Sequence, residues 1–218
     1  MEMQEKKTST VEQVMEYRTW TSKLTHESMA KISAFEQEYD VFTQAFEENG
    51  RYGVKDACGE VLVPAQFDDI SCTFSDSYRH WAVPVVNEGK MALVASDGKG
   101  TLHTPFEYDK IHFYEGYYYL IKDDKMGLAT VGGRILVPAA MDKVYEPFND
   151  LIMFEKDGKY GFSMLGSDVL TEAIYDDYEV GDDEYLIVEK DGVRGYLDEE
   201  GHFTTESDDS FFYAGCCL

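Results

Sequence analysis

The chain has little positive charge. Its 218 residues include 19 Lys and Arg against 43 Asp and Glu, which gives a formal net charge of -24 at pH 7. Proteins bind nucleic acids and anionic membrane surfaces through positive potential. We therefore expect no nucleic-acid partner and no membrane partner, and we expect a protein partner to be basic. An alternative interpretation is that the acidic surface only keeps an aromatic-rich chain soluble.

Long apolar runs and a cysteine framework are missing as well. No stretch approaches the roughly 20 apolar residues of a membrane-spanning helix, and residues 1–10 carry no apolar run of a secretory signal. The cysteines fit neither a zinc site nor a compact disulfide framework, and they are Cys58, Cys72, Cys216 and Cys217. Free thiols in a reducing compartment are the simplest account, so we expect a cytoplasmic protein.

Residues 1–49 contain neither glycine nor proline, the residues that disfavour helices most. Ser9 and Glu12 fit a capping box at a helix start. Apolar side chains then recur at steps of three and four, as on one face of a helix: Ile32, Phe35, Tyr39, Phe42 and Phe46. We predict one long helix, or a helical hairpin bent near residues 22–28, that ends at Asn49-Gly50. The apolar stripe either packs on its own domain or mediates dimerisation, so the oligomeric state stays open.

From residue 50 onward a short motif recurs. A large side chain followed by glycine or alanine stands at five places, separated by 39, 35, 34 and 34 residues: Tyr52-Gly53, Met91-Ala92, Met126-Gly127, Tyr160-Gly161 and Arg194-Gly195. A bulky residue followed by Asp recurs in register after four of them: Phe67-Asp68, Tyr108-Asp109, Met141-Asp142 and Tyr175-Asp176. Such a period is typical of repeat architectures, in which each unit is stable only against its neighbours.

This pattern resembles the WG repeat family, also called KWG repeats. The family's unit runs from Lys-Trp/Tyr-Gly through a turn and an apolar strand ending in proline to an aromatic-Asp pair. The clearest matches are residues 50–54 with 61–64 and 67–70, and residues 157–162, and the resemblance covers about residues 49–205. No unit keeps Trp, Ala92 replaces one glycine and Arg194 replaces an aromatic residue. The family is mostly bacterial and has no single activity, so the resemblance implies a fold and not a function.

Each repeat is predicted to hold three short strands in an antiparallel meander. In the fourth repeat these are residues 159–164, 169–172 and 184–190, with a loop at 175–177. Asp157-Gly158 and Asp191-Gly192 are typical of type I′ hairpin turns, which need positive φ at both central residues.

The recurring positions have expected structural roles. The marker glycine, which lacks a Cβ, admits a neighbouring ring or a bulge. The proline ends a strand, where its missing N–H costs nothing. The aromatic residue of the aromatic-Asp pair fills the seam between repeats, and its Asp accepts a hydrogen bond from a backbone N–H two residues on.

The predicted fold is mainly β: about four to five antiparallel β-meander repeats of the WG type, propeller-like or an open solenoid, preceded by one or two α-helices. The predicted domains are a helical segment at 1–49, the repeat domain at 50–205 and a tail at 206–218.

The sequence contains no motif that asks for catalysis, a cofactor or a metal. Phosphate-binding, dinucleotide-binding and nucleophile-elbow patterns are missing. The five histidines have no ligand spacing, and the acidic runs lack the offsets of a calcium loop. We therefore expect no catalytic residues, no cofactor and no metal ligands, and interpret the protein as non-enzymatic.

The candidate interaction surface combines exposed tyrosines with acidic residues: Tyr114, Tyr117, Tyr119, Asp182, Asp183 and Glu184. Alternate rings of a strand point to opposite faces, so half of the aromatic run 113–119 can be exposed; the alternative is cross-strand pairing inside the sheet. The expected function is a protein-protein interaction module, inhibitor-like or immunity-like toward a basic partner. The alternative is a module that binds carbohydrate or cell-wall fragments with tyrosine rings.

Overall fold

The structure is a computed structural model, in which strands form two compact units, residues 1–107 and 108–218. It describes residues 7–8, 31, 34, 39–40, 43–56, 59–71, 81–148, 151–165, 169–180, 186–197 and 201–205. Within this described part, no helix is long and apolar enough to span a bilayer.

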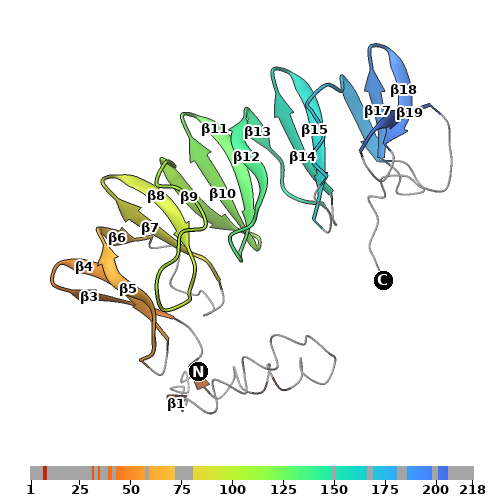
Figure 1. The fold of residues 1–218 in the computed structure, drawn as a ribbon. Coiled ribbons are helices and arrows are strands. Elements are labelled where there is room, and N and C mark those ends of the chain that lie inside the picture. The colour runs from red at the N-terminus through yellow and green to blue at the C-terminus, as the bar shows by residue number, and fades with distance from the viewer. Residues whose placement is uncertain are drawn as a thin grey trace, which may run out of the picture. The chain divides into compact units, whose positions relative to one another are not determined.

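The first unit contains two small antiparallel sheets and a short parallel pair (Figure 1). The parallel pair joins β1 (Lys7–Thr8) to β2 (Tyr39–Asp40). The first sheet has the order β3-β4-β5, with bounds Gln44–Glu48, Arg51–Lys55 and Val61–Phe67. The second has the order β6-β7-β8, with bounds Asp69–Ile70, Val83–Asn87 and Lys90–Val94.

The second unit contains three antiparallel sheets. The third sheet of the chain consists of β9 (Lys110–Tyr114), β10 (Tyr117–Lys122), β11 (Lys125–Thr130) and β12 (Ile135–Met141). The fourth consists of β13 (Lys143–Val144), β14 (Leu151–Lys156) and β15 (Lys159–Met164). The fifth consists of β16 (Asp177–Val180), β17 (Leu186–Lys190), β18 (Val193–Leu197) and β19 (Phe203–Thr204). Every strand order is open, so no sheet of described residues closes into a barrel.

The five markers occupy one position in this architecture. Each is the third residue of its strand, and each pairs with the preceding strand in the same register: Phe46 with Gly53, Val85 with Ala92, Leu120 with Gly127, Phe154 with Gly161 and Val188 with Gly195. The predicted repeat is therefore confirmed at the level of strand pairing.

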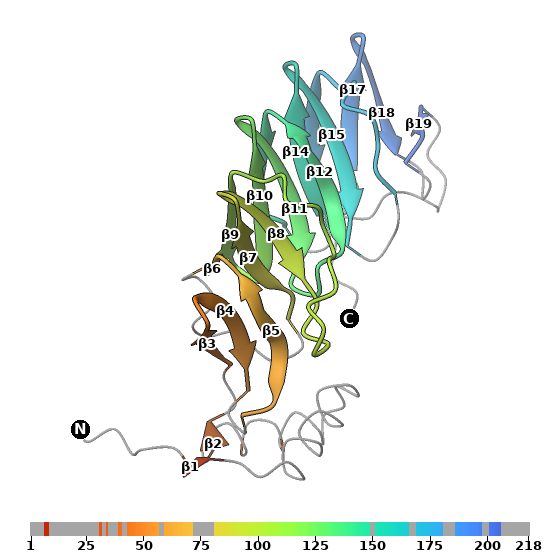
Figure 2. The ribbon, with the colours of Figure 1, turned by 60° about the vertical axis from the view of Figure 1, so that its left-hand side comes forward.

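The hairpin turns before the markers also share one geometry. Asp157-Gly158 has φ values of 53° and 73°, and Asp191-Gly192 has 53° and 75°, as the predicted type I′ turns require. Two consecutive residues with positive φ also occur at Asn49-Gly50, Glu88-Gly89 and Asp123-Asp124. In the second unit, the tips of the β10–β11, β14–β15 and β17–β18 hairpins point the same way (Figure 2).

The marker glycines lie where another chain segment passes too close for a side chain. A Cβ on Gly127 would lie 2.6 Å from the backbone nitrogen of Ala139, and one on Gly53 would lie 2.6 Å from the carbonyl oxygen of Val63. At Gly161 the obstacle is the Phe154 ring. Both expected reasons for the glycine, a bulge and an approaching ring, are thus present.

The predicted role of proline as a strand end is wrong at two places. Pro64 lies inside β5 and Pro138 lies inside β12. Both occur where the ladder to the marker strand shifts register, between Val63 and Phe67 and between Val137 and Met141. The missing N–H is tolerated because a bulge interrupts the ladder there.

The core lies between successive sheets of each unit. In the first unit, one buried cluster joins Val63 and Phe67 of the first sheet to Ile70, Val83 and Val85 of the second. Fully burying such a side chain contributes roughly 1.5–3 kcal/mol. The bulky residue of each aromatic-Asp pair is buried: Phe67, Tyr108, Met141 and Tyr175. Phe67, Met141 and Tyr175 belong to the clusters between sheets, as expected for a residue that fills the seam.

Three further predicted local structures are wrong. Residues 44–48 form β3, whereas we expected a helix through Phe46 that ended at Asn49-Gly50. That dipeptide is a hairpin turn, and Phe46 faces the marker strand. Most of the rest of the expected helical segment lies outside the described residues, but Lys31 and Ala34 have helical backbone, whereas Tyr39 lies in the strand β2. An additional strand follows each Asp of the aromatic-Asp pairs, as β6, β9, β13 and β16, where we expected a loop. The second strand that we predicted at residues 169–172 of the fourth repeat is also wrong, because only an isolated bridge between Leu170 and Ser163 forms there.

Candidate functional site

The tyrosine-rich hairpin is formed by β9 and β10, joined by a turn at Glu115-Gly116. Tyr118 is buried and contacts Phe113 edge to face, whereas Tyr114 keeps 47% of its surface exposed. Tyr117 and Tyr119 are half-buried and pack against the cluster between the third and fourth sheets. Alternate rings of β10 thus face opposite sides of the strand, as expected, and among these four tyrosines only Tyr114 is exposed.

Tyr114 and Tyr119 line a groove of about 340 Å³ on this face, which we call the tyrosine groove. The remaining lining comes from Lys110, His112, Ile121 and Met126. The rings of Tyr114 and Tyr119 meet edge to face with centroids 6.4 Å apart. Burial, followed by the nearby Glu146 carboxylate, raises the pKa of Tyr119. Its hydroxyl therefore stays protonated and can donate a hydrogen bond at neutral pH.

The acidic part of the predicted surface is only partly described. Asp182, Asp183 and Glu184 lie outside the described residues. On the strands that flank this segment in sequence, Asp177, Glu179 and Glu189 line a hollow of about 210 Å³ with Ile187 and Arg194. Residues 160–218 hold 16 of the 43 acidic residues and two of the 19 Lys and Arg. The negative charge is therefore concentrated toward this end of the sequence.

Each Asp of the four aromatic-Asp pairs binds the hairpin turn of the sheet that follows it, and Asp68, Asp142 and Asp176 also bind the preceding sheet. We call this arrangement the Asp joint. One oxygen of its carboxylate accepts a hydrogen bond from the first backbone N–H of the next hairpin turn. These hydrogen bonds run from Glu88 to Asp68 (2.6 Å), Asp123 to Asp109 (2.8 Å), Asp157 to Asp142 (2.7 Å) and Asp191 to Asp176 (2.8 Å). The expected bond to a residue two positions on is wrong, because the partner lies 14 to 20 residues ahead.

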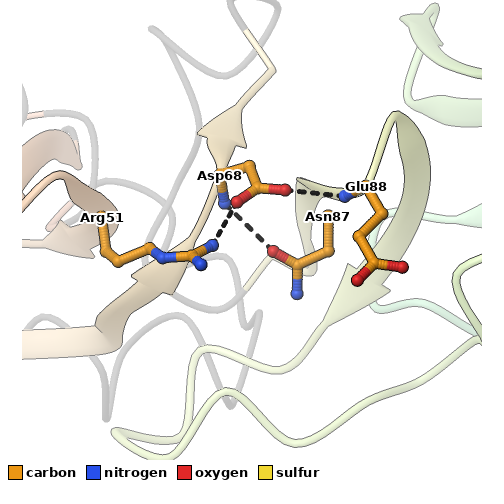
Figure 3. A network of polar contacts seen from close by, with 4 residues as sticks. All are labelled: Arg51, Asp68, Asn87 and Glu88. Atoms are coloured by element: carbon orange, nitrogen blue, oxygen red, sulfur yellow. Dashed lines mark hydrogen bonds and ion pairs between the residues drawn. The ribbon is translucent and has the colours of Figure 1, made fainter.

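The second carboxylate oxygen of three joints binds a cation from the marker strand. Arg51 pairs with Asp68 (Figure 3), Lys125 with Asp142 and Lys159 with Asp176. These pairs are well exposed, so they contribute little to stability compared with the buried clusters. Their value is positional, since each fixes the hairpin of the next sheet against the strand before it.

The Asp joints predict a dependence of stability on acid. The Lys125 ammonium and then the Asp157 N–H hold the pKa of Asp142 below its usual range, and Lys159 and the Asp191 N–H do so for Asp176. A depressed folded-state pKa contributes stability that is complete above the ordinary carboxyl range and is lost as the pH falls through the folded value. We expect the urea concentration at which half of the protein is unfolded to decrease as the pH is lowered below about 4. Circular dichroism at a series of pH values measures it.

The control for this prediction is the double variant Asp142→Asn with Asp176→Asn. An amide oxygen can still accept from the turn N–H, but it cannot ionise. The variant should lose less of its midpoint over the same acid range. If the urea midpoint decreased equally in the wild type and the variant, groups other than Asp142 and Asp176 would cause the acid dependence.

The histidines and acidic residues of the described part do not gather into a cluster of metal ligands. No group of three or more His, Cys, Asp or Glu side chains lies close enough to hold a metal ion within this part of the chain. His112 lines the tyrosine groove, and His103 lies in the loop after β8 in the other unit. His26 and His80 lie outside the described residues.

The fold defines a repeat protein built from small antiparallel sheets that pack in succession within each unit. Residues 95–125 match the family model described as "WG containing repeat". The resemblance to the WG family is thus confirmed for this segment, which lies between the markers Ala92 and Gly127 and includes the Tyr108-Asp109 pair. A search of curated proteins gave no match to the chain.

Proposed function

We propose that this protein is a non-enzymatic protein-interaction module that holds a basic partner protein at the tyrosine groove. The groove supports this, because it is an apolar hollow beside an exposed tyrosine on a strongly acidic chain. Tyrosines anchor interfaces well, since they combine a large apolar ring with a polar tip. The groove lies on strands of a packed sheet, so little ordering is needed when a side chain of the partner enters.

The net charge supports the basic character of the partner. Charge complementarity raises association rates and disfavours partners of like charge more than it adds affinity. Inhibition of a basic active site is the concrete form of this proposal. The proposed compartment is the cytoplasm, where the four cysteines stay as thiols.

Carbohydrate binding through Tyr117 and Tyr119 has weaker support. Both rings pack against the core cluster and are half-buried, so neither offers a whole face to a ligand. Tyr114 is the exposed ring of the three.

Truncating Tyr114 should weaken partner binding. We expect Tyr114→Ala to reduce affinity by about tenfold or more, the size of an interface hot spot. The measurement is retention of partner proteins from a lysate on immobilised protein, followed by titration of the purified partner at low and high salt. Wild-type binding should weaken as ionic strength rises.

The matched control is Phe148→Ala. Phe148 belongs to the same unit, is 57% exposed and lies outside the groove. It should leave affinity unchanged. If Tyr114→Ala and Phe148→Ala reduced the affinity equally, the groove would not be the binding site. If the affinity did not change with ionic strength, electrostatic attraction would not contribute to binding.

A further inference from the structure

The first unit contains a polar pocket of about 440 Å³ around the Asp68 joint, which we call the Phe106 pocket. It is lined by Arg51, Gln66, Asn87, Glu88, Lys90 and Phe106 together with Asp68. These residues come from both sheets of the unit, so the pocket exists only when the two sheets pack together.

Two lining residues depart from the pattern that the chain sets in its other repeats. Phe106 stands two residues before its aromatic-Asp pair, where the other repeats have Ala65, Ala139 and Ala173. Asn87 directly precedes its hairpin turn, where the repeats of the second unit have Lys122, Lys156 and Lys190. Phe106 and Asn87 both line this pocket. Neither is needed to form the Asp joint, because the joints at Asp142 and Asp176 form without such residues.

The charges in the pocket balance. Arg51 and Lys90 oppose Asp68 and Glu88, so the lining has no formal excess of either sign. Such a lining does not select a phosphate, a carboxylate or a free cation. It suits a neutral ligand with many hydrogen-bonding groups.

The polar groups are held in place by the joint. The Asn87 Oδ1 accepts from the Asp68 N–H at 3.0 Å, which turns the Asn87 NH₂ away from that contact (Figure 3). The Gln66 Nε2 lies 3.5 Å from the Lys99 carbonyl oxygen, at the outer limit of a hydrogen bond. Amide and carboxylate groups together both donate and accept, as paired hydroxyl groups require.

Phe106 supplies an apolar face beside these polar groups. It is half-buried and packs against Phe67, with ring centroids 6.1 Å apart, so its position is fixed by the core. A sugar ring has this same combination of an apolar C–H face and a rim of hydroxyl groups. The volume falls in the lower part of the range of small-ligand sites, roughly 300–1,000 Å³.

We propose that the Phe106 pocket binds one ring of a neutral saccharide, with the C–H face on Phe106 and the hydroxyl groups on Asn87, Gln66 and Glu88. The site lies in the first unit, whereas the tyrosine groove lies in the second. Saccharide binding is therefore separate from partner binding, and each can fail without the other.

The test is an NMR titration of the full chain with neutral saccharides: glucose, galactose, N-acetylglucosamine and their trisaccharides. We expect one or more of them to shift the side-chain amides of Asn87 and Gln66 and the backbone amide of Glu88. Phe106→Ala should weaken that binding about tenfold, as loss of one aromatic contact does. Asn87→Lys should weaken it as well, because it removes an amide and adds unbalanced charge.

Both substitutions install the residue that other repeats carry, so both variants should fold, which unchanged backbone resonances of the first unit away from the pocket verify. Tyr114→Ala should bind saccharide like the wild type. The proposal is overturned if no saccharide shifts the pocket residues. It is also overturned if both variants bind as well as the wild type, or if inorganic phosphate or glutamate shifts these residues where saccharides do not.

Discussion

Gly127→Ala should lower the free energy of unfolding by about 3 kcal/mol, as overpacking against a rigid neighbour does. The added Cβ would lie 2.6 Å from the Ala139 nitrogen and 2.8 Å from the Val137 carbonyl oxygen. Both atoms belong to the backbone of β12 at its bulge, so no side-chain rotation relieves the contact. The measurement is the urea midpoint and slope of the variant against the wild type.

Gly132→Ala is the matched control. Gly132 lies in the same unit, has no positive φ, and its added Cβ would meet only the Thr130 hydroxyl at 3.8 Å. Its free energy of unfolding should change by less than about 0.5 kcal/mol or rise slightly, because alanine restricts the unfolded chain. If Gly127→Ala proves as harmless as this control, the close crossing of β11 and β12 is wrong.

Phe154→Ala should be at least as damaging, with an expected loss of about 3–5 kcal/mol for a buried ring. Phe154 is 1% exposed and joins the cluster between the third and fourth sheets. Its ring also occupies the space in front of Gly161. Urea denaturation should report the loss as a lower midpoint.

The double variant of Phe154→Ala with Gly161→Ala tests whether the Phe154 ring is the reason that residue 161 must be glycine. Gly161→Ala alone should destabilise, because its Cβ meets the Phe154 ring. In the Phe154→Ala background the ring is gone, so the same substitution should cost much less, a coupling of about 1 kcal/mol or more between contacting residues. Additive losses would show that Phe154 does not lie over Gly161. No such rescue is expected at Gly127, where the obstacle is backbone.

The repeat, the turns and the seam-filling residues were predictable because each leaves a local signal. A glycine without space for a Cβ recurs at one register, and Asp-Gly marks the type I′ turns at Asp157 and Asp191. Phe67 and Tyr175 recur beside an Asp and are buried as predicted.

Other features left ambiguous signals or none. Phe46 continues a helical spacing from Phe42, so the sequence favoured a helix end at Asn49-Gly50, whereas pairing with β4 determines the structure. Strands of two residues, such as β6 and β13, are too short to show a period. The partner of Asp142 is a turn 15 residues later, and no local pattern points to it.

The candidate sites show the same division. Alternation in β10 predicted that Tyr118 would differ from Tyr117 and Tyr119, and burial follows that pattern. The greater exposure of Tyr114 depends on its position on the edge strand β9, which the sequence alone does not show. Phe106 could have been found by comparing repeats position by position, since alanine stands at its three counterparts.

The most direct test of the account is an NMR map of the cross-strand contacts beside the five hairpin turns. Residues opposite each other at non-hydrogen-bonded positions bring their Cα atoms to about 4.5 Å, so their Hα atoms give strong contacts. The expected pairs are Glu47 with Tyr52, Val86 with Met91, Ile121 with Met126, Glu155 with Tyr160 and Glu189 with Arg194. Five equivalent contacts would establish one β-sheet unit repeated along the chain. A different register at any marker, or helical contacts through residues 44–48, would contradict it.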